Sequence, residues 1–183
     1  MTKKKKVLII LSSIILLIIF FPVAYLSPFK GQVIGTGTKE PIEGAVVLVV
    51  YWKEVPTIVA GSNTYPADAQ ETLTDKHGEF SIPWKLAWFG KAKWWPEANV
   101  NIFKPGYGAF PRHKRATAVG VNKSWPPPKK YIVYEIPKLK TISERRSNLP
   151  RSFSEIPYEK RKLFFKLINE EYMSLGFSPR SKN

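Results

Sequence analysis

The sequence has no cysteine among its 183 residues. This excludes disulfide bridges, thiolate metal sites, a thiol nucleophile and a lipid-modified N-terminal cysteine. Histidine is also scarce: neither His77 nor His113 has a His, Cys or carboxylate at the spacing of metal ligands, so we expect both to lie in exposed turns. The sequence therefore predicts no metal site.

Familiar catalytic and nucleotide-binding motifs are missing as well. The chain has no phosphate-binding loop, no Gly-x-Ser-x-Gly and no dinucleotide fingerprint. Its acidic residues are scattered, and Asp75 is better explained as a turn former than as half of a catalytic pair. We therefore expect no catalytic residue and no cofactor.

Acidic residues are few. The 14 Asp and Glu stand against 29 Lys and Arg, which gives a net charge of +15. Five lysines lie in residues 1–30, which contain no acid, yet the remainder of the chain is still strongly basic. Such a chain attracts anionic partners, such as phospholipid headgroups or acidic envelope polymers. Nucleic acid is not expected.

A positive run and a long apolar segment open the chain. Four lysines occupy residues 3–6, and residues 7–21 are apolar except for Ser12 and Ser13, with apolar residues continuing to Leu26. A helix of about twenty residues spans about 30 Å, the thickness of a hydrocarbon core. We expect residues 1–27 to form a cytoplasmic lysine run and a single-pass transmembrane helix, oriented N-in and C-out.

A cleaved signal peptide fits this segment less well than an uncleaved signal-anchor. Cleavage after Ala24 would place Pro22 two residues earlier, and cleavage after Ser27 would place Tyr25 there. Neither is the small residue that a signal peptidase requires. The sequence thus predicts that the rest of the chain is tethered to the cell membrane, in the periplasm or outside the cell, with the bilayer as one partner.

Residues 28–137 carry short β-branched runs broken by turn residues, which is typical of an all-β sandwich or barrel. Residues 44–52 are apolar at both alternating sets of positions and predict a strand covered on both faces. Residues 72–82 predict a hairpin, with Asp75 and Gly78 forming its turn. In this hairpin we expect Leu73, Phe80 and Ile82 to point inward and Thr72, Thr74, Glu79 and Ser81 to point outward.

Four sequence pieces in this region form an ordered pattern: Gly31-Gln-Val33, Pro41-Ile-Glu-Gly-Ala-Val-Val47, Thr74-Asp-Lys-His-Gly-Glu-Phe80 and Lys104-Pro-Gly-Tyr107. The pattern resembles the carboxypeptidase regulatory-like family, a transthyretin-like (prealbumin-type) β-sandwich. The resemblance implies a Greek-key sandwich of about seven strands, and a non-catalytic accessory module. Residues 53–71 and 83–98 depart from the family pattern as insertions.

The second insertion has the most distinctive composition of the chain. Aromatic residues with nearby cations can stack on sugar rings or lie at a membrane interface. The alternative is a loop whose rings cover one open end of the sandwich. The candidate ligand-binding residues are Trp84, Trp88, Trp94, Trp95, Lys91 and Lys93.

The remaining chain predicts a basic linker at 138–156, an amphipathic helix at 157–176 and a tail at 177–183. Apolar residues recur at helical spacing from Leu163 to Leu175, and Gly176 fits the helix end. We expect this helix to pack on the sandwich. An interfacial membrane helix and a partner-docking helix are the alternatives.

These observations favour a membrane-tethered, extracytoplasmic β-sandwich with a non-catalytic binding or structural role in the cell envelope. Its partner would be an envelope protein, a glycan or an anionic lipid. One alternative is an envelope-acting hydrolase with its site in residues 53–71 or 83–98. Another is an exported toxin or immunity-type accessory protein.

Overall fold

The computed structural model describes residues 3–20, 23–57, 61–88, 98–121, 126–151 and 153–181. Within them the chain is mostly β, with three sheets and few helices. The strands are β1 Val23–Leu26, β2 Phe29–Gly35, β3 Val46–Thr57, β4 Gly61–Leu73, β5 Glu79–Ile82, β6 Lys85–Trp88, β7 Ala98–Phe103, β8 Thr117–Ala118 and β9 Tyr131–Ile136. The helices are α1 Lys3–Phe20, α2 Ile142–Ser147, the 3-10 helix η1 Tyr158–Lys160 and α3 Lys162–Ser174.

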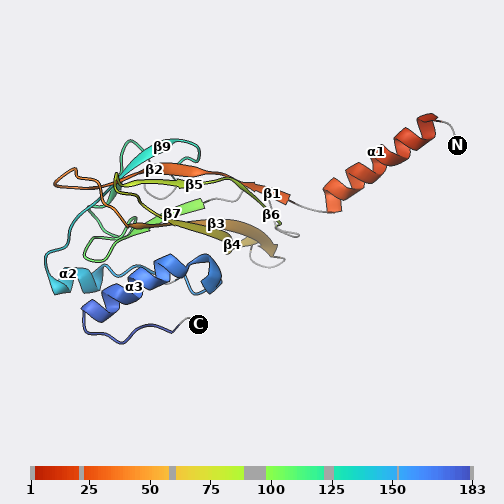
Figure 1. Ribbon diagram of the computed structural model, residues 1–183. Coiled ribbons are helices and arrows are strands. Elements are labelled where there is room, and N and C mark those ends of the chain that lie inside the picture. Colours follow the sequence, from red (N-terminus) through yellow and green to blue (C-terminus); the bar gives the residue numbers. More distant parts are fainter. Residues whose placement is uncertain are drawn as a thin grey trace.

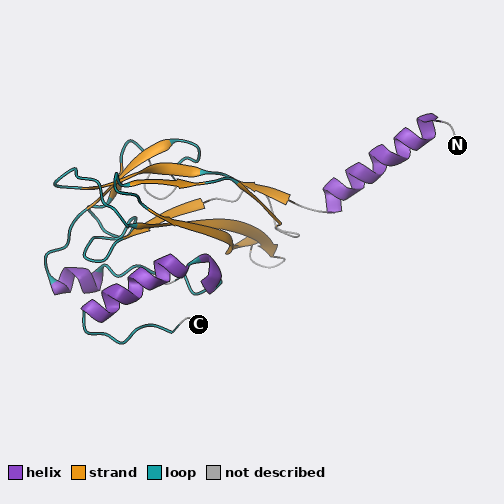
Figure 2. Cartoon of the chain, viewed as in Figure 1, coloured by secondary structure: helices purple, strands orange, loops and turns teal. Residues whose placement is uncertain are grey.

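Two of the sheets pack face to face. One has the strand order β5-β2-β9-β8, with β2 and β9 parallel, and the other has the order β4-β3-β7. Figure 1 shows these two layers, with α2 and α3 beneath the β4-β3-β7 sheet and α1 extending away from the strands. The same view coloured by secondary structure separates the helical layer from the two strand layers (Figure 2).

Strand β3 is buried on both faces, as its sequence predicts. Its residues 46–51 are all fully buried. Since side chains alternate along a strand, Val47, Val49 and Tyr51 enter the core between the sheets. Val46, Leu48 and Val50 enter a second core on the opposite face, which contains Phe164 and Ile168 of α3.

The C-terminal helix supplies the second cover, which confirms its predicted packing on the sandwich. The Phe103 and Phe164 rings meet edge to face, with centroids 6.4 Å apart. Glu71 of β4 accepts hydrogen bonds from the backbone N–H groups of Leu163 (2.8 Å) and Phe164 (2.9 Å). A strand carboxylate thus satisfies donors that every helix leaves unpaired at its N-terminus, and it also complements the helix dipole.

The third sheet, which we call the ribbon, consists of β1 and β6 and continues the β2–β5 pairing. Val23 pairs with Trp88 and Phe29 with Ile82, so one antiparallel register runs through both sheets. That register places Pro28 opposite Pro83 at the break between them. Proline has no N–H to donate to a ladder, so two facing prolines interrupt the pairing.

The predicted transmembrane helix at the N-terminus is not supported by the structure. Among the described residues, no helix combines the length and apolar character needed to cross a membrane. The apolar run of the sequence is divided: α1 contains its first part, and residues 23–26 form β1. Hydrogen bonding to β6 gives these four residues a strand partner that lies about sixty residues further along the chain.

The predicted turn is confirmed, but the predicted hairpin is wrong: β4 pairs with β3 and β5 pairs with β2, so the turn connects two different sheets. Two of the predicted side-chain orientations are also reversed. Asp75 accepts hydrogen bonds from the backbone of His77 and Glu79, and Gly78 has φ of 71°. Phe80 and Ile82 are buried as predicted, whereas Leu73 is 42% exposed and Thr74 only 3%. The Thr74 hydroxyl donates to the Ile42 carbonyl and accepts from the Ala45 N–H, so it turns inward to satisfy buried backbone groups.

Two segments read from the sequence as an insertion and a linker contain regular structure. Residues 53–71 mostly extend β3 and β4 into one long antiparallel pair, with a register shift between Tyr51 and Trp52. Residues 138–156 contain α2, whose first turn has a capping box formed by Thr141 and Glu144.

The first prediction concerns the core beneath α3. Ile168 is buried in that core, so Ile168→Ala should lower the free energy of unfolding by about 2–5 kcal/mol. Met173 is exposed on the same helix, and Met173→Ala is the matched control, expected to change stability by less than about 0.5 kcal/mol. Chemical denaturation of the full chain measures both. Equal effects of the two variants would contradict the described packing of α3.

Candidate functional site

One face of the ribbon is exposed and apolar. Tyr25 and Leu86 are register partners, and Trp84 lies two residues from Leu86, so all three share a face. Their exposed fractions are 44%, 57% and 58%. The Tyr25 and Trp84 rings stack with centroids 5.9 Å apart. We call these three residues the ribbon face.

The opposite face of the ribbon packs into the protein. Leu26 is fully buried, and Ala87 packs against the core between the sheets. This alternation fixes which side chains the ribbon exposes. The core therefore does not require the apolar side chains of the ribbon face. Large apolar side chains that are exposed together often mark an interaction surface.

Of the six predicted ligand-binding residues, the structure describes the side chain of one. Trp84 is described and exposed, so it does not lie in the core of the sandwich. Trp88 lies at the end of β6, but its side chain is outside the described residues, as are Lys91, Lys93, Trp94 and Trp95 entirely. For these five, the prediction of a binding role stays a prediction.

Sequence reasoning missed Tyr25 and Leu86. In the sequence, Tyr25 continues the apolar N-terminal run, and Leu86 is an isolated aliphatic residue among lysines and tryptophans. Two facing X-Pro steps, at Ser27-Pro28 and Ile82-Pro83, were the available signal for two strands of one interrupted ladder. Nothing in the sequence alone sets the register that pairs these distant segments.

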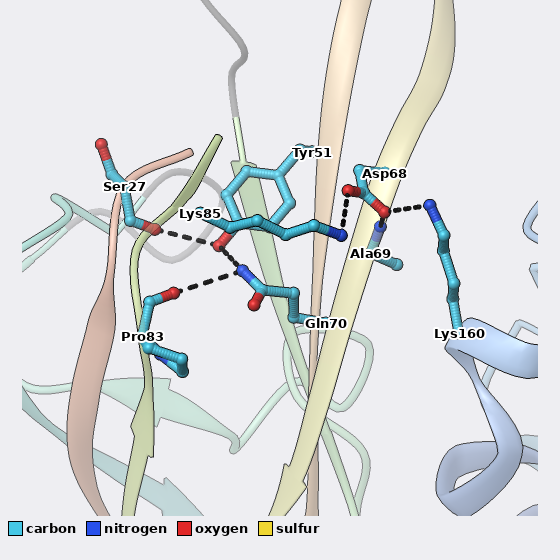
Figure 3. Close-up of polar contacts among 8 residues, drawn as sticks. All are labelled: Ser27, Tyr51, Asp68, Ala69, Gln70, Pro83, Lys85 and Lys160. Atoms are coloured by element: carbon cyan, nitrogen blue, oxygen red, sulfur yellow. Dashed lines mark hydrogen bonds and ion pairs between the residues drawn. The ribbon is translucent and has the colours of Figure 1, made fainter. Parts of the chain in front are cut away.

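Asp68 forms a polar junction at the ribbon's edge of the sandwich (Figure 3). Its carboxylate is 2.9 Å from the Lys85 ammonium of β6, pairs with Lys160 of η1, and accepts from the Ala69 N–H. Burial alone would raise the pKa of this carboxyl. The bonds from Lys160, Lys85 and Ala69 outweigh burial and lower the pKa of Asp68 below its ordinary value of 3.8.

Tyr51 and Gln70 form a second set of bonds beside this junction, at the proline break. The Tyr51 hydroxyl donates to the Ser27 carbonyl at 2.9 Å and accepts from the Gln70 amide at 3.1 Å (Figure 3). Gln70 also donates to the Pro83 carbonyl at 3.3 Å. Burial, together with the negative charge of Asp68, raises the pKa of Tyr51 to about 12, against the opposing bond from Gln70.

Another carboxylate of the described chain, that of Glu171, is bonded in the same manner. Glu171 is buried and receives two bonds from the Arg145 guanidinium, at 2.7 and 2.6 Å, and one from the Gly106 N–H at 3.1 Å. Each of these acids connects two or more elements through protein donors. Their charge-assisted hydrogen bonds hold neighbouring elements together.

One of the two histidines differs from expectation. His77 is exposed in the Asp75–Gly78 turn, as predicted. His113 is only 5% exposed, and its Nδ1 accepts from the Arg115 N–H at 3.1 Å, so its prediction as an exposed turn residue is wrong. A Cβ on Gly108 would lie 2.6 Å from the imidazole, which shows how closely the backbone packs on this ring. Within the described ranges, no three His, Asp or Glu residues are grouped to hold a metal ion.

Comparison with protein-family models, with curated proteins and with solved structures gives no match. A function is therefore proposed from the features of the described chain itself.

The second prediction concerns the pH dependence of the junction. Because the folded pKa of Asp68 is depressed, its stabilisation is fully present above pH 3.8 and is lost as pH falls through the lower, folded value. Asp68→Asn should cost about 1 kcal/mol at neutral pH, since solvent screens the partly exposed lysines, and progressively less in acid.

The matched control is Glu170→Gln. This carboxylate lies 3.9 Å from Lys166 on the surface of α3, so we expect little change in stability at any pH. Denaturation of each variant at several pH values gives the comparison. An Asp68→Asn cost that stays constant into acid would contradict the depressed pKa.

The third prediction tests the bonds at the proline break. Tyr51→Phe removes the donor to the Ser27 carbonyl, which should weaken ribbon docking by about 1 kcal/mol and speed local opening about five-fold. Hydrogen exchange at the amides of β1 and β6 reports this opening. Tyr131→Phe removes a surface bond to Glu79 and should leave the ribbon amides unchanged. Unaltered ribbon exchange in Tyr51→Phe would argue against this role.

Proposed function

We propose that this chain is a membrane-tethered β-sandwich with a non-catalytic binding or structural role, held on the outer side of the cell membrane. The observation that carries the proposal is the exposure of α1. Its apolar side chains at residues 7–11 and 14 are all exposed. Burying such side chains in an apolar medium is favourable by on the order of 5–10 kcal/mol for the set. Lipid is the medium that can cover a helix that is apolar all round.

The charge at the start of α1 supports an orientation. Residues 3–6 are all lysine, and their ammonium groups can reach headgroups while their stems stay with the apolar helix. Positive charge on the N-terminal side favours a cytoplasmic N-terminus. The part of α1 that follows the lysines, residues 7–20, rises about 21 Å, which is shorter than a hydrocarbon core. The proposed anchor therefore needs the reach of the lysine stems and local thinning of the bilayer to bring the strands to its far surface.

The family resemblance is part of the proposal, and the roles of its motif residues support it. A Cβ on Gly31 would lie 2.0 Å from the Ile132 carbonyl oxygen, where β2 and β9 pair in parallel. A Cβ on Gly78 would lie 2.5 Å from the Val33 carbonyl oxygen. Both motif glycines thus permit close backbone contacts. We accordingly propose a transthyretin-like, Greek-key arrangement of the regulatory-like type.

A binding or structural role agrees with the use of three acids at the boundaries between elements. Asp68, Glu71 and Glu171 are each engaged by donors from neighbouring elements. A general acid or base needs a group that can exchange a proton with a substrate. Since these three carboxylates bond to protein donors and hold elements together, the proposed role is binding through the surface of the sandwich.

The fourth prediction tests the tether. The full chain should float with phospholipid vesicles in a density gradient and resist alkaline extraction. Ile10→Lys combined with Ile14→Lys places two charges one turn apart in α1 and should release the protein. Ile142→Lys, in the exposed first turn of α2, is the matched control and should not. Flotation of the α1 double variant at the parent level would show that α1 is not the anchor.

The orientation can be tested with single cysteines, since the parent has none. In sealed cells, Lys76→Cys, at an exposed turn, should react with a membrane-impermeant maleimide, and Thr2→Cys should react after permeabilisation only. The reverse pattern would place the sandwich in the cytoplasm and overturn the proposed location.

A further inference from the structure

The ribbon face lies directly beside the proposed anchor in the chain. α1 ends at Phe20 and β1 begins at Val23, so a helix embedded in lipid would deliver Tyr25 to the bilayer surface. Figure 1 shows the ribbon as the part of the strand structure that faces α1. The register then brings Leu86 and Trp84 to the same place from β6.

The residues of this face have the chemistry of a membrane interface. Tyr and Trp are enriched at the headgroup level because their rings are apolar and their polar atoms can remain hydrated. Leu86 adds an aliphatic side chain that is more than half exposed. Burying its exposed surface and those of the two rings in lipid is favourable.

Positive charge lies beside the same face. The Lys129 ammonium is 5.4 Å from the centre of the Tyr25 ring, and the Lys129 backbone N–H donates to the Pro28 carbonyl at 3.0 Å. Lys129 is thereby held at the proline break, and Lys130 next to it is also exposed. Such lysines are attracted to anionic headgroups.

We propose that the sandwich rests on the bilayer through the ribbon face, with Tyr25, Trp84 and Leu86 at the headgroup level and Lys129 and Lys130 against anionic lipids. This inference rests on the proposed function, because it needs α1 in the same bilayer. Lipid is favoured over a glycan because one face of the Trp84 ring already stacks on Tyr25, with the planes 20° apart. The aliphatic Leu86 likewise suits acyl chains better than a sugar.

The test uses the full chain in vesicles of phosphatidylcholine with or without phosphatidylglycerol. Leu86→Cys carries a polarity-sensitive fluorophore, and Lys76→Cys carries the same fluorophore as the control. Lys76 is exposed in the turn that precedes β5, at the end of that strand away from the ribbon. We expect a blue shift and quenching by headgroup-level spin-labelled lipid at position 86 and neither at position 76.

The charges are tested in the same assay. Lys129→Gln with Lys130→Gln should lower the docked-to-undocked ratio at position 86 about five-fold per lysine in anionic vesicles. Lys138→Gln with Lys140→Gln removes two exposed lysines elsewhere and should leave that ratio unchanged. Trp84→Ala should also reduce quenching at position 86 while the protein still floats.

The outcomes separate the two proposals. If the protein floats and position 86 stays aqueous, the ribbon inference is overturned and the tether survives. If the protein does not float, both fail together. If soluble oligosaccharides shift the fluorophore and anionic lipid does not, the ribbon face binds glycan, and the lipid assignment is wrong.

Discussion

The double burial of β3 is the constraint on which the rest of the structure depends. Val46, Leu48 and Val50 on one face and Val47, Val49 and Tyr51 on the other leave no part of residues 46–51 exposed to solvent. One sheet can cover a single face, so the second face requires another layer. The C-terminal helix is that layer. For this reason α3 belongs to the fold rather than to a tail that could dock elsewhere.

A basic chain holds these layers together with its few acids. Asp68 joins β4 to β6 and η1, Glu71 caps α3 from β4, and Glu171 joins α3 to α2. Each carboxylate lies where an outer element meets the sandwich, and each receives donors from that element. The surplus of Lys and Arg is left for the surface, where it can meet an anionic partner.

The features that could be predicted from the sequence are those with a local cause. The apolar run of β3, the Asp75–Gly78 turn and the periodicity of α3 each contain their own signal. Thr74 was misplaced because its partners, Ile42 and Ala45, are about thirty residues away. The ribbon was missed for a related reason: residues 23–26 continue an apolar run, and only pairing with residues 85–88 makes them a strand.

The proline break gives the ribbon face its direction. Along the paired strands, buried positions pass from Leu26 in β1 to Phe29 in β2, so the alternation shifts by one residue across Ser27-Pro28. The carbonyls around the break are bonded by Tyr51, Gln70 and Lys129 rather than by a ladder. Since Tyr51 belongs to β3, the central strand itself fixes how the ribbon leaves the sandwich. A contact made at Tyr25 and Leu86 is therefore connected to the core through the bonds of Tyr51, so it would orient the whole sandwich.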